Sequence, residues 1–204
     1  MLGRAELLLD RVQDPEMVRR LATIRQIALE GAATIRRLQE YARTRPAREV
    51  GPVDLDRTIH EAVELTRPHW QTAAQSGIRY EIGIDAELIP PVAGVAEELR
   101  DAFTNVLVNA FDAMPDGGQI IVRLGRDGDH AVVIIHDTGQ GMSEQTRQQM
   151  FDPFFTTKGP QRNGLGLSVV WGIVTRHGGT IGAMSAMGTG TTFTIRLPIS
   201  GVTC

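Results

Sequence analysis

The sequence predicts an α+β protein, a two-layer α/β sandwich with a mixed sheet preceded by an α-helical hairpin. Residues 1–46 carry only helical patterns of apolar residues. Over residues 47–204, helix and strand patterns mix without the strict alternation that is typical of a doubly wound parallel sheet. Pro46 and the pair Gly51-Pro52 interrupt the chain between the two patterns. We therefore expect a hairpin over 1–46 and a second domain over 47–204.

Two helices are expected in the first part, over residues 2–12 and 17–44. Asp14-Pro15 separates them, because proline favours the first turn of a new helix. The second helix carries an apolar stripe at steps of three, four and seven residues, formed by Leu21, Ile24, Ala28, Ile35, Leu38 and Ala42. The first helix is too short to cover this stripe. Either a further helix or another chain covers the stripe, or the hairpin simply packs on its own domain.

The second part contains both period-3.6 and period-2 patterns. Helices are expected over 55–75, 96–113 and 165–177. Strands are expected over 78–84, 119–125, 130–136, 180–185 and 191–197. A lid-like stretch precedes the last helix.

The composition excludes several classes of protein. With 21 basic and 24 acidic residues the net charge is -3, which offers no attraction to a nucleic-acid backbone or an anionic membrane. The single cysteine, Cys204, excludes a disulfide within one chain and favours a reducing compartment. No apolar run approaches the roughly 20 residues that span a bilayer, and no signal peptide follows Met1. We expect a soluble, cytoplasmic chain without nucleic-acid or membrane partners.

The helix over 96–113 carries a polar stripe with neither lysine nor arginine. Its members are Glu98, Asp101, Asn105, Asn109 and Asp112. A solvated face normally mixes both signs of charge and avoids asparagine, which is a poor helix former. Oxygen ligands of this kind suit Mg²⁺, which needs only one or two side chains when it also binds phosphate. A merely solvated face remains an equal alternative on this stripe alone.

Two glycine-rich turns offer further binding groups. Asp137 ends a predicted strand just before Gly139 and Gly141, so its carboxylate could accept a hydrogen bond from an adenine amine. An aspartate-capped tight turn is the alternative. Gly164 and Gly166 open an apolar helix, where bare N–H groups and the helix dipole favour an anion such as phosphate. This turn matches neither a P-loop nor a dinucleotide fingerprint.

The stretch Phe151–Lys158 contains three of the chain's six phenylalanines. These rings could simply anchor a long loop to the core. A lid over a nucleotide needs the same features, with Lys158 as a cation that reaches phosphate. Thr191, in the turn that opens the last strand, could lie near the base, although that turn also reads as an ordinary hairpin.

The order and spacing of these motifs over 98–193 resemble the nucleotide-binding domain of sensor histidine kinases, within the superfamily of gyrase, heat-shock chaperone, kinase and mismatch-repair ATPases. The resemblance implies a Bergerat-type fold that binds ATP and Mg²⁺, with Asn109 as metal ligand and Asn105 and Lys158 in catalytic positions. The implied nucleotide-binding residues are Asn105, Asn109, Asp137, Gly139, Gly141, Met142, Phe154, Thr157, Lys158, Gly164, Leu165, Gly166, Leu167 and Thr191.

Residues 1–45 resemble the end of the first helix and all of the second helix of this family's dimerisation hairpin. The resemblance implies a homodimer, an acceptor histidine on a helix upstream of Leu2, and a response-regulator receiver domain as the final phosphate acceptor. None of the five histidines replaces the missing acceptor, because His60-Glu61 lacks the following asparagine and the others lack any such context. His69, His130, His136 and His177 are expected to be structural or surface residues. Some family members carry a basic residue at the position of Asp112, so we assign it no phosphate contact.

Hydrolysing members of the superfamily carry a glutamate where this chain has Asn105. An amide cannot accept a proton from water, whereas phosphoryl transfer to an imidazole needs mainly positioning and charge neutralisation. We therefore expect a histidine kinase catalytic domain that does not phosphorylate itself as this chain stands. A nucleotide-gated binding module without chemistry, or a serine kinase of the anti-sigma type, are the alternatives.

Overall fold

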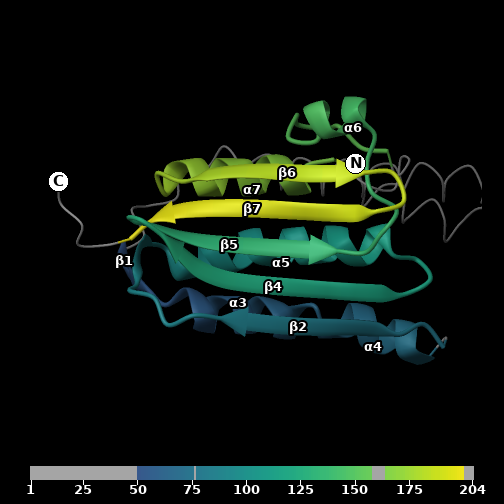
Figure 1. Ribbon diagram of the computed structural model, residues 1–204, viewed down its shortest axis with the longest axis horizontal. Helices are drawn as coiled ribbons and strands as arrows, with labels where there is room; N and C mark the ends of the chain where they lie inside the picture. Colours follow the sequence, from purple (N-terminus) through teal and green to yellow (C-terminus); the bar gives the residue numbers. More distant parts are fainter. Residues whose placement is uncertain (1–49, 76, 158–163, 200–204) are drawn as a thin grey trace, which may run out of the picture. The chain divides into compact units, whose positions relative to one another are not determined.

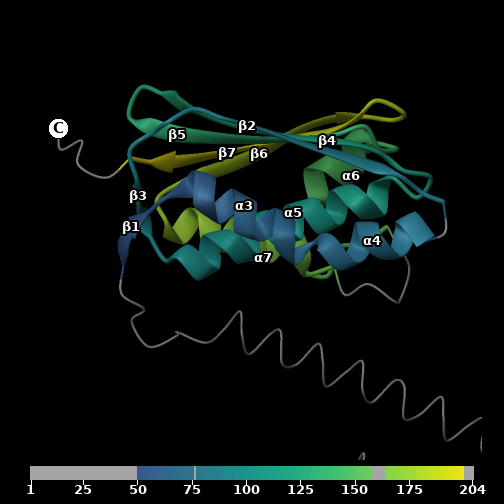
Figure 2. The same cartoon turned by 90° about the horizontal axis from the view of Figure 1, so that it is seen from below.

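The computed structural model of the protein describes residues 50–75, 77–157 and 164–199. The helical hairpin expected over 1–46 lies outside these residues. The described part is a two-layer sandwich in which α3, α5 and α7 cover one face of a five-stranded sheet (Figures 1 and 2). This arrangement confirms the predicted fold class.

The sheet has the strand order β2-β4-β5-β7-β6. Its strands are β2 (Tyr80–Ala86), β4 (Gly118–Asp127), β5 (His130–Asp137), β6 (Thr180–Ala186) and β7 (Gly190–Pro198). Strand β2 is parallel to β4, and every other neighbouring pair is antiparallel, so the sheet is mixed as predicted. The register places Asp137, the last residue of β5, directly opposite Thr191 near the start of β7.

A second, two-stranded sheet was not predicted. Strands β1 (Gly51–Val53) and β3 (Val92–Gly94) pair antiparallel, and an isolated bridge joins Val92 to Ile199 beyond β7. Strands of three residues contain too few positions for an alternating pattern to be read. The pair Gly51-Pro52 was therefore interpreted only as a break between the two parts of the chain.

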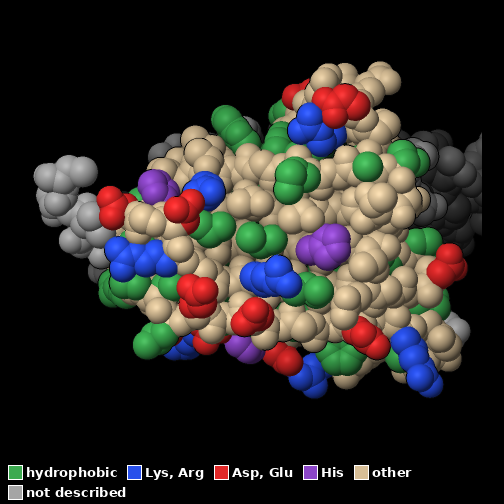
Figure 3. All heavy atoms as spheres, viewed as in Figure 1, with side chains coloured by type: hydrophobic (Ala, Val, Ile, Leu, Met, Phe, Trp, Pro, Cys, Tyr) green, Lys and Arg blue, Asp and Glu red, His purple; other side chains and the backbone are tan. Residues whose placement is uncertain are grey.

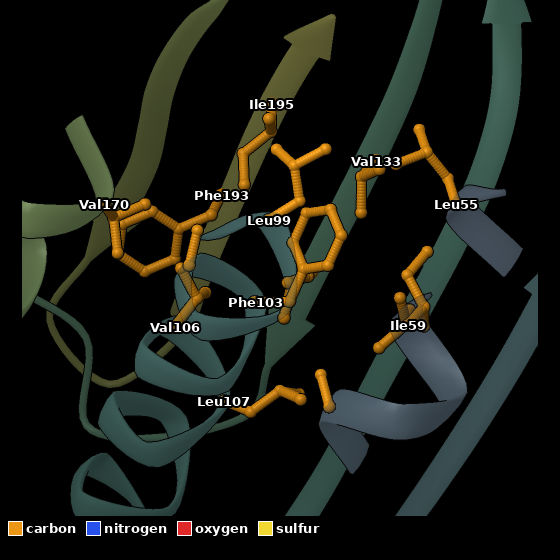
Figure 4. Close-up of a cluster of buried hydrophobic side chains, with 14 of the residues drawn as sticks. Leu55, Ile59, Leu99, Phe103, Val106, Leu107, Val133, Val170, Phe193 and Ile195 are labelled. Carbon is orange, nitrogen blue, oxygen red and sulfur yellow. The ribbon is translucent and has the colours of Figure 1, made fainter. Parts of the chain in front are cut away.

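The helices supply the other half of the core. They are α3 (Leu55–Leu65), α4 (Arg67–Gln75), α5 (Ala96–Ala113), α6 (Glu144–Gln149) and α7 (Gly166–Arg176). The predicted apolar face of α5 is fully buried, and it consists of Leu99, Phe103, Val106, Leu107 and Ala110. Side chains of α3, α5 and α7 meet those of β5 and β7 in one cluster (Figure 4). Because α5 is anchored along this face, its polar stripe has a defined position.

The single helix predicted over 55–75 is wrong, because the chain forms two helices that meet at Thr66. The Thr66 hydroxyl donates to the Val63 carbonyl oxygen at 2.7 Å, and the Thr66 N–H also reaches back to α3. Pro68 has no N–H to donate, and its ring would clash with the carbonyl of Glu64 in a continuous helix. Proline instead falls in the first turn of α4, where its missing N–H is tolerated.

Two smaller differences concern the loops. Strand β2 begins at Tyr80, two residues later than predicted. The stretch expected to be only lid-like contains the short helix α6, whose N-cap Ser143 accepts from the Thr146 N–H at 3.2 Å. A serine at this position satisfies a helix-start donor and explains why a helix forms there.

The face of the sheet opposite the helices carries scattered side chains of both charge signs and isolated apolar groups (Figure 3). Along β5, Val133 is fully buried on the helix side while Ile134 on the open side is only half-buried. This alternation is typical of a sheet covered on one face. In the part of the chain that the structure describes, no helix is both long and apolar enough to cross a membrane.

Candidate functional site

Asp137 is a buried carboxylate at the end of β5, with only 2% of its surface exposed. Its Oδ1 accepts from the Gly139 N–H at 2.9 Å and from the Thr191 N–H at 3.3 Å. Both donors are backbone groups held by the sheet and the following turn. The carboxylate is therefore fixed in orientation before any ligand arrives.

Gly139 joins this turn to the end of α5. A Cβ at Gly139 would lie 2.7 Å from the Ala113 carbonyl oxygen and 2.8 Å from Asp137 Oδ1, so any side chain would push the turn away from both. The Gln140 N–H donates to the same Ala113 oxygen at 3.0 Å. The turn after Asp137 is thus attached to the helix that carries the asparagines.

The next residues attach the turn to the hairpin between β6 and β7. Gly141 has φ +65°, and a Cβ there would lie 2.0 Å from the Ala186 carbonyl oxygen, so glycine is required. The Met142 N–H donates to Ser185 Oγ at 2.8 Å. The Gly188 N–H donates to the Gln140 oxygen at 2.7 Å. The loop predicted to pass a base is consequently held from both sides.

Ser185 and Gly190 organise this corner; the sequence analysis did not identify Ser185, and it included Gly190 only as part of the glycine turn that opens the last strand. Ser185 Oγ lies 3.0 Å from both the Gly190 carbonyl oxygen and Thr191 Oγ1. Because the Ser185 proton goes to the carbonyl, the Thr191 hydroxyl donates to Ser185. Gly190 has φ +86°, and a Cβ there would lie 1.9 Å from the Asp137 carbonyl oxygen. The sequence signals for this cluster were the glycine turn before β7 and a serine at a half-buried position of β6.

Asn105 and Asn109 face the start of α7. A Cβ at Gly166 would lie 3.7 Å from both Asn105 Oδ1 and Asn109 Nδ2, and glycine leaves that space unfilled. The Asn105 side-chain amide donates to the Asp101 carbonyl oxygen at 2.9 Å. This bond turns the oxygen of Asn105 toward α7. Ala113 lies one turn beyond Asn109, so one helix connects the Asp137 turn with Gly166.

The start of α7 is suited to an anion. Leu165 is its N-cap, and no side chain of the described residues caps the helix there. Ser168 Oγ donates to the Leu165 carbonyl oxygen at 2.9 Å, and Leu165 itself is buried. Leu167 is half-buried against the core. The N–H groups at this helix start and the positive end of the helix dipole therefore lie beside the two asparagines.

The predicted lid contains a residue, Phe154, in the left-handed region of backbone conformation. Phe154 has φ +69°, the one positive φ of a non-glycine among the described residues, and its side chain is 52% exposed. Its N–H donates to the Gly164 carbonyl oxygen at 3.0 Å, and Gly164 has φ +60°. Thr157 is exposed. Lys158 lies outside the described residues.

Two acids of the α5 stripe, Glu98 and Asp112, interact with residues of neighbouring elements. Glu98 Oε2 accepts from Arg176 of α7 at 3.2 Å. Burial, followed by the charges of Asp112 and Asp116, raises the pKa of Tyr80 above its usual value. The Tyr80 hydroxyl donates to the Met114 carbonyl oxygen at 2.8 Å.

The donor set around Asn109 fits an ion that takes most of its ligands from elsewhere. The described residues hold no group of three or more histidine, cysteine, aspartate or glutamate side chains that could bind a metal unaided. Mg²⁺ commonly binds through one or two side chains together with phosphate oxygens and water. Asn109 beside an anion-binding helix start matches that requirement.

Comparisons with known proteins identify the family and the fold. Residues 94–201 match the family described as histidine kinase-, DNA gyrase B-, and HSP90-like ATPase. Sporulation kinase E of Bacillus subtilis is 41% identical over 112 residues, which are 54% of this chain and 15% of that protein. Sensor kinase CckA of Brucella abortus is 33% identical over 204 residues, covering 92% of this chain and 21% of that protein.

A solved structure of the mycobacterial sensor histidine kinase MprB superimposes with a TM-score of 0.61 and 33% identity. The match covers 74% of this chain and 97% of that structure. By contrast, the chain spans 15% and 21% of the length of the two curated relatives.

Proposed function

We propose a catalytic role for this chain because it belongs to the family of histidine kinase-, DNA gyrase B- and HSP90-like ATPases. It is the ATP-binding catalytic part of a sensor histidine kinase and transfers the γ-phosphoryl group to a histidine. The observation that carries the proposal is the start of α7, where the N-cap Leu165 makes no side-chain capping bond and Gly166 lies beside the amides of Asn105 and Asn109.

Asp137 recognises the adenine base in this proposal. Its carboxylate accepts a hydrogen bond from the exocyclic amine, and the Gly139 and Thr191 N–H groups hold it in place. Gly139, Gly141 and Met142 let the backbone pass close to the ring. Burial strengthens the selection, because an analogue with an acceptor at this position leaves the carboxylate facing another acceptor.

The phosphate tail extends from the base along α5 to the start of α7. The N–H groups from Leu165 to Leu167 bind phosphate oxygens, and Gly164 and Gly166 allow the close approach. Asn109 holds Mg²⁺, whose positive charge neutralises the phosphates. Asn105 lies alongside the phosphates and orients them through an N–H of its side-chain amide, because its oxygen and the phosphate oxygens are all acceptors.

Asn105 favours phosphoryl transfer over hydrolysis. Its amide cannot take a proton from water, and one of its two N–H bonds already donates to the Asp101 carbonyl oxygen. Histidine brings its own nucleophilic nitrogen, so transfer proceeds without a base at this position. Glu98 does not replace the base, since it lies about three turns from Asn109 and pairs with Arg176.

The other parts of the proposal come from the resemblance. Residues Phe151–Lys158 act as the lid, with Phe154 and Thr157 near the nucleotide and Lys158 reaching the phosphates. Residues 1–46 belong to a dimerisation hairpin in a cytoplasmic homodimer, and a response-regulator aspartate receives the phosphoryl group. The acceptor histidine lies on a helix absent from this sequence.

The test is phosphotransfer in trans. The full 204-residue chain is mixed with a polypeptide that carries the acceptor-histidine helix, together with radiolabelled ATP and Mg²⁺. We expect acid-labile label on histidine with the wild-type chain and none with Asn109→Ala. ATP binding without transfer would favour the nucleotide-gated binding module, and acid-stable label on serine would favour the serine kinase.

A further inference from the structure

His177 forms a bridge between the end of α7 and the beginning of α5. Its Nδ1 lies 2.8 Å from the Ile173 carbonyl oxygen, one turn earlier on α7. Its Nε2 lies 3.0 Å from the backbone N–H of Val95, which is the N-cap residue of α5. The two bonds use both ring nitrogens and join segments 82 positions apart in the chain.

The two partners determine the protonation of the ring. A carbonyl oxygen only accepts, so Nδ1 carries the proton, and a backbone N–H only donates, so Nε2 is the acceptor. His177 is therefore neutral in this arrangement. The ring also packs closely on Gly94, where a Cβ would lie 2.5 Å from His177 Cδ2. Any side chain at position 94 would displace the ring from Val95.

The end of α7 is held at two further points. A Cβ at Gly179 would lie 2.3 Å from the Arg196 carbonyl oxygen, so glycine permits close contact with β7. Arg176 donates to Glu98 of α5 at 3.2 Å. The Arg176 side chain is 54% exposed, whereas that of Glu98 is only 13% exposed. All three contacts act at the end of α7 that is remote from Gly166.

We propose that His177 is a positioning residue that sets the alignment of α7 against α5 along their axes, an inference that rests on the proposed function. The helices run antiparallel, since Val95 meets His177 at one end and Asn105 faces Gly166 at the other. Val95 to Asn105 spans about 15 Å of helix and Gly166 to His177 about 16 Å, at about 1.5 Å per residue. If α7 slides along α5 at the His177 end, Gly166 therefore moves by about the same distance relative to Asn105 and Asn109.

Loss of the His177 bridge should affect only the part of the site that binds phosphate and metal. Asp137 and Thr191 lie on strands and bond to each other's segments without using α7. The anion-binding N–H groups belong to α7, while Asn109 belongs to α5. Loss of the His177 bridge separates the phosphate ligands from the metal ligand and leaves base recognition in place.

Two substitutions separate the functions of the two ring nitrogens. His177→Gln can place an amide oxygen near the position of Nε2 and so accept from Val95. His177→Asn can donate to Ile173 but is too short to reach Val95. His60 on α3 offers a matched control, because its Nδ1 lies 2.9 Å from the Asp56 carbonyl oxygen one turn earlier on an exposed face. His60→Asn and His60→Gln change the same atoms away from the bridge.

The measurements are calorimetric affinities for adenosine and for ATP with and without Mg²⁺, made on the full chain. We expect His177→Asn to bind adenosine with the affinity of the wild type. The factor by which Mg²⁺ increases ATP affinity should be about tenfold smaller in this variant than in the wild type. His177→Gln and both His60 variants should keep that gain. Arg176→Gln, a change on an exposed side chain, should lose part of it even if His177→Asn fails to fold.

The outcomes separate this inference from the proposed function. Equal losses for adenosine and Mg²⁺-ATP in His177→Asn would indicate general destabilisation and overturn the inference, as would indistinguishable Asn and Gln variants. An unchanged Mg²⁺-dependent gain in both His177→Asn and Arg176→Gln would also overturn it. A wild-type chain that binds neither adenosine nor ATP would overturn the proposed function itself.

Discussion

Replacing Asp137 by asparagine should remove adenine recognition and leave the fold intact. Both backbone donors that orient Asp137, the N–H groups of Gly139 and Thr191, reach the same oxygen, Oδ1. An amide oxygen in that place keeps both bonds. The amide nitrogen then occupies the other position and presents N–H donors to the adenine amine, so a charged acceptor is replaced by a donor facing a donor.

The size of the expected loss in ATP affinity follows from replacing a charged acceptor by a donor. A hydrogen bond to a charged group contributes roughly 1.5–3 kcal/mol, which corresponds to a loss of about 10- to 100-fold in ATP affinity. Inosine triphosphate, which offers an oxygen where adenine has its amine, should bind Asp137→Asn relatively better than it binds the wild type. Calorimetric titration with both nucleotides measures this change, and Asp85→Asn, an exposed carboxylate on β2, is the control.

The reasoning is refuted by either of two results. Wild-type ATP affinity in Asp137→Asn would mean that the carboxylate does not contact the base. A loss of affinity by the same factor for ATP and inosine triphosphate would indicate a structural defect. Circular dichroism of the variant distinguishes a folded protein that has lost recognition from an unfolded one.

Three further predictions concern the fold around the site. Gly141→Ala places a Cβ 2.0 Å from a carbonyl oxygen at φ +65°, so chemical denaturation should show a loss of more than about 1 kcal/mol in the free energy of unfolding. Phe103→Ala, which empties a fully buried position, should lose about 3–5 kcal/mol in the same measurement. Burial, Asp112 and Asp116 raise the pKa of Tyr80, so its contribution to stability is fully present below pH 10.0 and is lost as pH rises through the folded value. Denaturation at about pH 9 and about pH 11 should show this loss in the wild type and a smaller one in Tyr80→Phe.

The part of the fold that the sequence predicted best is α5, whose observed bounds, Ala96–Ala113, are those of the prediction. Eighteen residues contain several turns of a strongly periodic pattern, so both the helix and its buried face could be identified. The break at Thr66 was missed because the apolar pattern continues across it. Pro68 was the available signal, and its steric demand on the preceding turn outweighed periodicity.

Some residues of the candidate site could be identified from the sequence, and others could not. Asp137, Gly139 and Gly166 stood out because a carboxylate at a strand end and glycines before a helix are local signals. Ser185 did not stand out, and Gly190 indicated only a hairpin turn, because their contacts depend on the register of β6, β7 and β5. Those contacts also involve backbone oxygens, and a carbonyl has no residue type to be read from sequence.

The position of His177 illustrates the same limit at longer range. The sequence analysis expected a structural or surface residue, and the ring does bond to two backbone groups. Its partner Val95 is far away in the chain, so only the antiparallel packing of α5 and α7 reveals what the ring holds in place.

The most direct test of the whole account is calorimetric titration of ATP, with and without Mg²⁺, on the wild-type chain and Asn109→Ala. The account predicts that Mg²⁺ tightens ATP binding to the wild type and that Asn109→Ala loses this gain while still binding nucleotide without metal. No adenine-nucleotide binding by the wild type, or the same Mg²⁺-dependent gain in both proteins, would contradict it.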